Sequence, residues 1–333
     1  MYQKMSTTFT LSNDLPVIAE PDAVSKRKYT KKSVAEPVAK PVAEPVAKPV
    51  AKPTRKTTKK TVAQPVKETP VQKTNVINPA FQQIVCMSGL PRSGSTLLSA
   101  LLSQNPAIHA EGNSAVCQLL WDMYVSTTQN CGEQLKANDR ERTIRDLISS
   151  IPHIYYKDIS ANIVVDKCRS WSLLPNIQLL QAFVGSDIKM IILERPMEEI
   201  VKSFAKLYKE NGVYDEEKMN NLLTPDVEPI MRSFNGLKYA KNNNEKGQFL
   251  FVSYADLVNR TVETLHDIYE FCGWEWFEHN FINIVNKFPE NDEVYNLKGM
   301  HEVRPMISMK ENPVKLSDVL IEKCVALDAE LKV

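Results

Sequence analysis

The stretch GLPRSGST, residues 89–96, determines which fold this chain should adopt. It follows a short apolar run, IVCM at 84–87, and precedes LLSALL at 97–102, an apolar segment that suits a helix. A strand, a glycine turn and a helix N-terminus in this order direct backbone N–H groups at an anion, and the helix dipole adds partial positive charge. The spacing of Gly89 and Gly94, followed by Ser95 and Thr96, is that of a nucleotide phosphate-binding loop.

This loop departs from that of an NTPase in the position of its cation. An NTPase carries a lysine directly after the second glycine, where it reaches the β- and γ-phosphates. Here that position is Ser95, and the cation is Arg92, inside the loop. The sequence therefore predicts a site for a phosphate-like group that is not built for ATP hydrolysis.

Strands and helices should alternate over the folded part, residues 79–333. Apolar runs predict strands at 84–87, 162–166, 189–194 and 249–253. Helical spacing predicts helices at 96–103, 115–125, 141–151, 173–183, 198–208 and 257–271, the last closed by Gly273 in a left-handed cap. Continuous apolar strands alternating with helices indicate an α/β fold of three layers, with a central parallel sheet covered by helices on both faces.

Four polar or charged residues directly follow predicted strands: Arg92, Lys167, Arg195 and Tyr254. The carboxyl ends of parallel strands meet at one edge of a sheet, where ligands bind in such folds. We therefore expect one cleft to collect all four side chains.

The segment LPRSGSTLL at 90–98 resembles the 5′-phosphosulfate loop of the sulfotransferases that use 3′-phosphoadenosine 5′-phosphosulfate (PAPS). The form is closest to that of tyrosylprotein and of bacterial and phage sulfotransferases. The resemblance implies a P-loop-like fold and in-line transfer of the sulfuryl group to a hydroxyl acceptor, such as a glycan, a peptide tyrosine or a small molecule. It implies no metal, and it assigns the loop residues to the cofactor: Pro91, Arg92, Ser93, Gly94, Ser95 and Thr96.

Downstream motifs extend this resemblance. Lys167 matches a family lysine that interacts with the transferring sulfuryl group and the bridging oxygen. The segment ERP at 194–196, with Ser203 eight residues after Arg195, resembles the 3′-phosphate motif. Arginine would grip that phosphate with two hydrogen bonds, and the serine hydroxyl would add a third donor.

Two weaker matches complete the expected cofactor site. Tyr254 corresponds to a family tyrosine near the cofactor. LKGMHEVR at 297–304 resembles a terminal Lys-Gly loop that closes over the cofactor in related bacterial and phage proteins, so Lys298 and Gly299 are expected there.

The general base is left open by the sequence. In the tyrosylprotein enzymes a glutamate follows the loop helix, and counting from Arg92 without gaps places that position at Asn113. Glu111 lies two residues earlier, at an expected turn, and a small shift in the loop would bring it into place. His109 is the alternative base, and neither residue need be the base.

Residues 1–78 differ in composition from the rest. VAEP and VAKP units repeat between Val34 and Pro53, and proline at every fourth position excludes helix interiors and central strands. Residues 1–75 carry 15 Lys and Arg and 6 Asp and Glu, a net charge of +9, whereas the whole chain carries +1. We expect a disordered basic tail, either a solvated linker or an electrostatic tether to an acidic partner.

Composition bears on compartment and on the rival functions. The six cysteines show no paired spacing, and neither a signal peptide nor an 18-residue apolar run is evident, so a soluble cytoplasmic protein is expected.

Two rival functions remain. One rival is a P-loop kinase of a small molecule, with Asp166 holding magnesium, although Ser95 replaces its lysine. The other is an inactive nucleotide-binding protein whose basic tail is the functional part.

Overall fold

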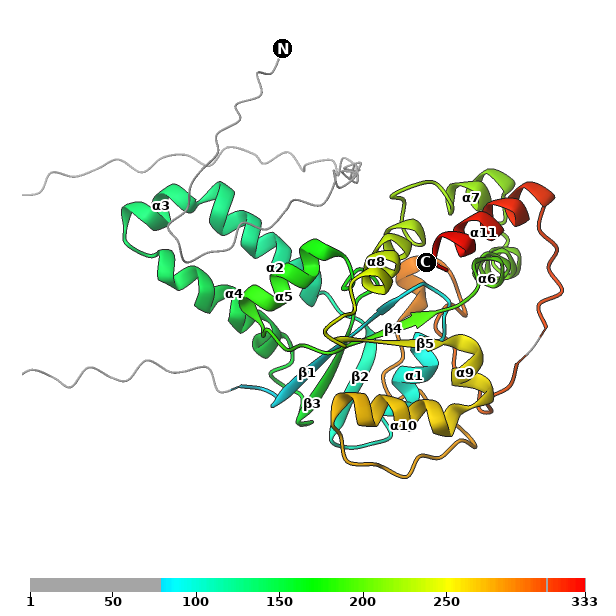
Figure 1. Cartoon of the computed structure of the whole chain (residues 1–333), viewed down its shortest axis with the longest axis horizontal. Coiled ribbons are helices and arrows are strands. Elements are labelled where there is room, and N and C mark those ends of the chain that lie inside the picture. Colours follow the sequence, from blue (N-terminus) through cyan, green and yellow to red (C-terminus); the bar gives the residue numbers. More distant parts are fainter. Residues whose placement is uncertain (1–78, 310, 333) are drawn as a thin grey trace, which may run out of the picture. The chain divides into compact units, whose positions relative to one another are not determined.

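The structure is a computed structural model that describes residues 79–309 and 311–332. The predicted tail, residues 1–78, lies outside the described residues. Five parallel strands form one sheet in the order β2-β3-β1-β4-β5 (Figure 1). The strands are β1 (Gln83–Gly89), β2 (Ile108–Asn113), β3 (Ile163–Lys167), β4 (Met190–Glu194) and β5 (Phe249–Ser253).

Helices cover both faces of this sheet, so the predicted three-layer α/β fold is confirmed (Figure 1). One face packs against α1 (Ser95–Leu102), α9 (Tyr254–Asn259) and α10 (Thr261–Cys272). The other face packs against α2 (Val116–Val125), α4 (Glu141–Tyr155), α5 (Leu174–Phe183), α6 (Met197–Glu210), α7 (Glu216–Asn221), α8 (Met231–Asn242) and α11 (Asp318–Glu330). The remaining elements are α3 (Gly132–Ala137), the π-helix η1 (Ser126–Asn130) and the 3-10 helix η2 (Asp292–Tyr295).

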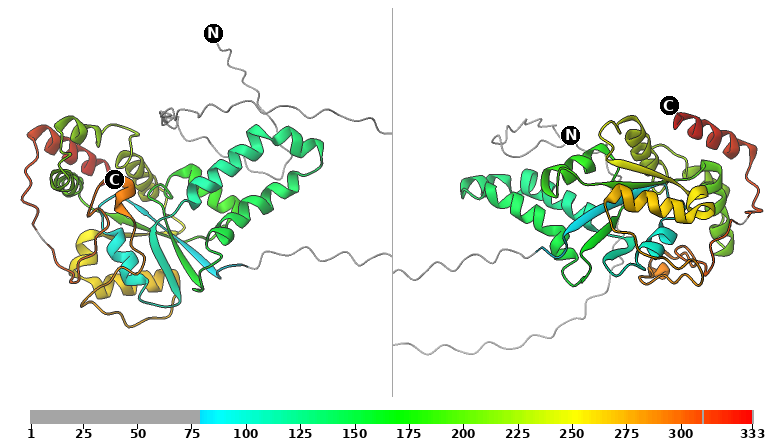
Figure 2. Two further views of the ribbon diagram at one scale, coloured as in Figure 1. Left: turned by 180° about the vertical axis from the view of Figure 1, so that it is seen from behind. Right: turned by 60° about the horizontal axis from the view of Figure 1, so that its bottom comes forward.

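Helices α2 and α4 lie side by side and project from the sheet as a hairpin (Figure 2). Within the described part of the chain, every helix is too short or too polar to cross a membrane.

Two sequence-based predictions of local structure were wrong. Glu111 was expected at a turn, yet it lies in the edge strand β2, which pairs with β3 on one side only. The single helix expected at 257–271 is two helices, α9 and α10, because Arg260 leaves helical geometry with φ −133 and ψ 47. The predicted left-handed cap at Gly273 is confirmed by its φ of 72.

The turn after β1 depends on Gly89, the first glycine of the loop. Its φ is 118, a conformation that side chains disfavour, and a Cβ added there would lie 2.1 Å from the backbone oxygen of Leu193 in β4. Only glycine fits at this position, because β1 and β4 approach closely there, at the middle of the carboxyl edge of the sheet.

Candidate active site

The loop between β1 and α1 has the conformation of an anion-binding turn. Arg92 and Gly94 both take positive φ values, 60 and 97. Gly94 is the N-cap of α1, no side chain caps this helix end, and its first turn carries no acidic residue. Its first N–H groups are therefore left for an anion, which the helix dipole also favours.

A cavity of about 420 Å³ opens beside this loop, at the carboxyl ends of β1, β3 and β4. It is lined by six basic side chains, those of Arg92, Lys167, Arg169, Arg195, Lys206 and Arg304, against three acidic ones. Ten of the residues predicted from the sequence line it: Pro91, Arg92, Gly94, Ser95, Thr96, Lys167, Arg195, Ser203, Tyr254 and Gly299. The predicted cleft is therefore present, and its charge suits an anionic ligand.

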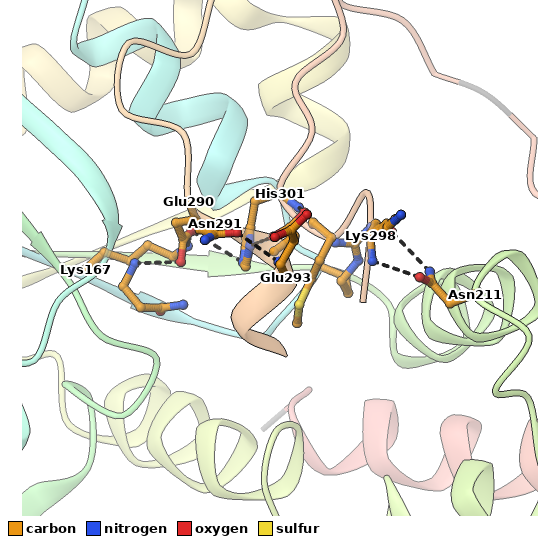
Figure 3. Close-up of polar contacts among 11 residues, drawn as sticks. Lys167, Asn211, Glu290, Asn291, Glu293, Lys298 and His301 are labelled. Atoms are coloured by element: carbon orange, nitrogen blue, oxygen red, sulfur yellow. Dashed lines mark hydrogen bonds and ion pairs between the residues drawn. The ribbon is translucent and has the colours of Figure 1, made fainter. Parts of the chain in front are cut away.

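Ser93 and Lys298 contribute differently from the others. Ser93 is fully buried, and its hydroxyl donates to the carbonyl of Leu90, so it supports the loop from within. The backbone of Lys298 is clamped by Asn211, whose side chain both accepts from its N–H (2.8 Å) and donates to its carbonyl (3.0 Å; Figure 3). This clamp positions Gly299 at the cavity wall.

Arg92 is fixed by contacts from two distant segments. Its Nε donates to the hydroxyl of Ser203 on α6 at 3.0 Å, and its Nη1 donates to the carbonyl of Met300. Burial, and then the neighbouring Arg195, lower the pKa of Arg92 from its usual value. Two guanidinium groups held together in a cavity wall favour an anion between or beside them.

Arg195 lies against the ring of Tyr254, with its guanidinium carbon 4.0 Å from the ring centroid. Its Nε donates to Glu199 at 2.9 Å and its Nη1 to the backbone carbonyl of Arg92 at 2.8 Å. These bonds use two of the five N–H groups of an arginine and hold its plane in one orientation. Tyr254 also packs on the loop, because a Cβ on Gly94 would come within 2.9 Å of its ring.

Lys167, the last residue of β3, is a buried cation in the cavity wall, with 5% of its surface exposed. Burial lowers the pKa of its ammonium from 10.5 to about 8, while the nearby carboxylate of Glu290 acts in the opposite direction. The ion pair between Lys167 Nζ and Glu290 Oε2 measures 3.8 Å (Figure 3).

A long loop, residues 282–306 and here called the terminal segment, brings Glu290 to this place. Its ends meet in a bridge between Ile282 and Met306, and Ile284 donates to the carbonyl of Pro305 at 2.9 Å. Lys287 ties the segment to the carbonyl of Ser103 after α1, at 2.8 Å. The segment carries Glu290 and His301, neither of which was predicted from the sequence as a site residue. Glu290 belongs to no recognisable motif, and in LKGMHEVR at 297–304 only Lys298 and Gly299 were expected at the site.

The two predicted bases lie together on β2. His109 Nε2 and Glu111 Oε2 are 3.1 Å apart, and the ring of His109 packs on Phe288. His109 pairs with Val164 of β3, and its contact with Glu111 places both side chains on the face of the sheet that carries Asp166. Neither His109 nor Glu111 lines the cavity, whereas Asn113 does.

Asp166, the magnesium ligand of the kinase alternative, is fully buried and already satisfied. It accepts hydrogen bonds from Ser114 (2.6 Å), Tyr156 (2.7 Å) and Trp171 (2.6 Å). Its carboxylate fixes the end of β3 rather than facing the cavity. Over residues 79–309 and 311–332, no cluster of His, Cys, Asp and Glu is arranged to hold a metal ion.

The fold and the cavity together define an α/β protein of the P-loop-like class with an anion-binding site. Within that class, the model of the Sulfotransferase family matches residues 85–278, more than half of the chain, and the protein belongs to this family. No curated protein sequence matches the chain significantly.

Solved structures with a similar fold include two sulfotransferase domains and a retinol dehydratase. A sulfotransferase domain from the curacin biosynthetic pathway is 16% identical, with a TM-score of 0.45 over 74% of this chain and 96% of its own. A sulfotransferase domain from the Synechococcus PCC 7002 olefin synthase is 17% identical, with a TM-score of 0.42 over 77% and 98%. Retinol dehydratase in complex with androsterone and inactive cofactor PAP is 16% identical, with a TM-score of 0.44 over 75% and 81%.

Proposed function

We propose that this protein is a PAPS-dependent sulfotransferase that moves the sulfuryl group to a hydroxyl acceptor by in-line displacement. The proposal rests on one observation: an uncapped helix N-terminus and three partly or fully buried cations line the same cavity. Those cations are Arg92, Lys167 and Arg195, and the chain belongs to the sulfotransferase family.

In this proposal the loop residues 91–96 hold the 5′-phosphosulfate, where α1 offers its first N–H groups. Arg195 and Ser203 hold the 3′-phosphate, which distinguishes PAPS from ATP. The ring of Tyr254 holds the guanidinium of Arg195 in one orientation by stacking against it. The backbone around Lys298 and Gly299 covers the cofactor. PAPS supplies the sulfuryl group, and the proposal requires no metal.

Lys167 is proposed to stabilise the transition state. As the sulfuryl group leaves, negative charge builds on the bridging oxygen, and a fixed ammonium beside it contributes more to the transition state than to ground-state binding. A lysine with a pKa of about 8 rather than 10.5 costs about 3 kcal/mol of folding stability when protonated. Such a cost supports a functional role for this lysine over a purely structural one.

The proton acceptor among the residues of β2 is proposed to be Glu111, with His109 as the alternative. Their 3.1 Å contact makes them a carboxylate–imidazole pair, so either could take a proton with the support of the other.

We also propose a cytoplasmic location, supported by six free cysteines. The kinase alternative has less support, because Asp166 is committed to three hydrogen bonds.

Binding distinguishes the proposed function from its rivals. Melting temperature is measured with adenosine 3′,5′-bisphosphate (PAP), with ATP and magnesium, and without ligand. A ligand at about 100 times its dissociation constant should stabilise the protein by about 2.7 kcal/mol. PAP should stabilise and ATP should not, and preference for ATP would refute the proposal.

Transfer is then measured with radiolabelled PAPS against phenols, tyrosine peptides and hydroxylated glycans. Lys167→Ala should lower turnover by orders of magnitude while leaving the affinity for PAP nearly unchanged. Transfer at the wild-type rate would show that the role assigned to Lys167 is wrong.

A further inference from the structure

We propose that Glu290 is a catalytic base that takes the proton of the acceptor hydroxyl, and that His301, held in place by Asp292, then receives that proton from Glu290. The inference rests on the proposed sulfuryl transfer. It assigns the role of base to the terminal segment instead of to the β2 residues Glu111 and His109, which are paired with each other.

The position of Glu290 is fixed at the carboxyl ends of β2 and β3. Its Oε1 accepts from the backbone N–H of Asn113 at 3.3 Å. Its side chain covers Gly112 so closely that a Cβ there would lie 2.1 Å from the carboxyl carbon. Asn113 and Lys167 both line the cavity, so the carboxylate of Glu290 sits directly behind the part of the wall nearest to Lys167.

The second oxygen, Oε2, is the free acceptor of this carboxylate among the described residues. It is buried, and among the described residues no group donates a hydrogen bond to it. Its two closest polar neighbours are Lys167 Nζ at 3.8 Å and His301 Nε2 at 3.4 Å (Figure 3). Buried carboxylate oxygens normally accept a hydrogen bond, and an acceptor hydroxyl beside Lys167 would supply one. Glu111, by contrast, is already paired with His109.

His301 and Asp292 provide an onward path for the proton. His301 Nδ1 lies 2.6 Å from Asp292 Oδ1, and the backbone N–H of His301 donates to Oδ2 at 3.0 Å. A carboxylate on Nδ1 fixes the tautomer that carries its proton there, which leaves the lone pair of Nε2 directed at Glu290. Burial lowers the pKa of His301, which favours this neutral imidazole before reaction.

The reaction consists of one sulfuryl-transfer step, followed by a proton transfer within the protein. The O–H bond of the acceptor breaks, its proton goes to Glu290 Oε2, and the oxygen lone pair forms the new bond to sulfur. The bond from sulfur to the bridging oxygen breaks, and its electron pair stays on that oxygen, beside Lys167. Glu290 then passes the proton to His301 Nε2, and Asp292 stabilises the imidazolium without being protonated itself.

The charges around this unit come from several elements. Lys167 lies on β3, Arg169 follows it, and Asp292 and Tyr295 lie on η2. Glu290 and Lys167 thus present one carboxylate and one ammonium to the two ends of an in-line transfer: the attacking oxygen and the leaving oxygen.

The test is the isosteric variant Glu290→Gln, with Glu293→Gln, which removes an exposed carboxylate of the same segment, as its matched control. The glutamine keeps the bond from Asn113 and the packing on Gly112 but cannot take a proton. Turnover with radiolabelled PAPS and phenol should fall at least 100-fold, in line with the usual contribution of a general base. Calorimetry should give PAP an affinity equal to or tighter than that of the wild type, because a negative charge beside the donor is gone. Glu293→Gln should stay within about threefold of the wild type on the same scale, and a large loss found in Glu111→Gln but not in Glu290→Gln would return the base to β2.

Acceptor acidity separates a base from a merely structural residue. The deficit of Glu290→Gln should shrink with 4-nitrophenol, whose more acidic hydroxyl needs less help to lose its proton. Wild-type turnover, joint loss of PAP binding and turnover, or an equal deficit with both phenols would each overturn the proposal. Asp292→Asn should shift the acidic limb of the pH profile of kcat while KM for PAPS stays the same, and an unchanged limb would remove Asp292 and His301 from the mechanism.

The proposed function fails in a different way. A wild-type protein that binds no PAP, or that transfers sulfate to no screened hydroxyl, refutes sulfuryl transfer itself. A wild-type protein that is active, together with an equally active Glu290→Gln, refutes only the role of Glu290.

Discussion

Raising the pH from 7 to 9 should lower kcat/KM for PAPS about tenfold, because Lys167 loses its proton. The pKa of Lys167 is about 8, so the ammonium accounts for about 90% of the free protein at pH 7 and about 10% at pH 9. Only the ammonium stabilises charge on the bridging oxygen, and activity should follow its population. The limb belongs to the free protein and therefore appears in kcat/KM.

The assay is transfer from radiolabelled PAPS between pH 6 and 10 at constant ionic strength, with an alcohol acceptor that does not ionise in this range. Lys167→Arg is the matched variant, because a guanidinium stays charged throughout. Its activity should be lower from the change in geometry, but its profile should be flat above pH 7. Glu290→Gln should move the limb to lower pH, because the carboxylate that raises the pKa of Lys167 has been removed.

A flat wild-type profile from pH 7 to 9.5 would refute this reasoning, as would an unchanged alkaline limb in Lys167→Arg. Calorimetric titration of PAP across the same range is the control. It separates loss of catalysis from loss of donor binding by the other cations of the cavity.

Three further predictions concern binding and stability. PAP should bind at least tenfold more tightly than 5′-AMP, since a charge-assisted contact contributes about 1.5 to 3 kcal/mol. Arg195→Ala should remove most of that difference, and equal affinities in the wild type would contradict the 3′-phosphate assignment. Gly94→Ala should weaken PAP binding at least tenfold, because φ is 97 and the new methyl group would meet the ring of Tyr254, and unchanged calorimetry would argue against a role for this turn. Deleting residues 1–75 should change the melting temperature by less than about 2 °C, because their proline-interrupted sequence has no core-forming pattern, and a large drop in a thermal scan would show that they support the domain.

Most of the cofactor side of the site follows from local sequence. Glycines at 89 and 94 mark a turn that needs positive φ, and both residues take it. Arg92, Lys167 and Arg195 each stand at or just after the end of an apolar strand. Because parallel strands end at one edge, residues at those positions meet in one cavity whatever the details of packing.

Strand β2 and the break between α9 and α10 were missed for local reasons. The buried His109 and the partly exposed Glu111 interrupt the apolar run that would have marked the edge strand β2. The helix break at Arg260 lies inside a continuous helical pattern, and only the backbone geometry there reveals it.

The sequence by itself determined the fold class, the family resemblance and the cations of the cavity, since each depends on periodicity or on residues close together in the chain. Only the tertiary structure decided which carboxylate stands beside Lys167. Glu290 reaches that place through contacts of the terminal segment with residues far away in sequence: Lys287 with Ser103, Lys298 with Asn211 and Met300 with Arg92. Such contacts leave no local pattern, because the path of a polar loop is fixed by the surfaces it crosses.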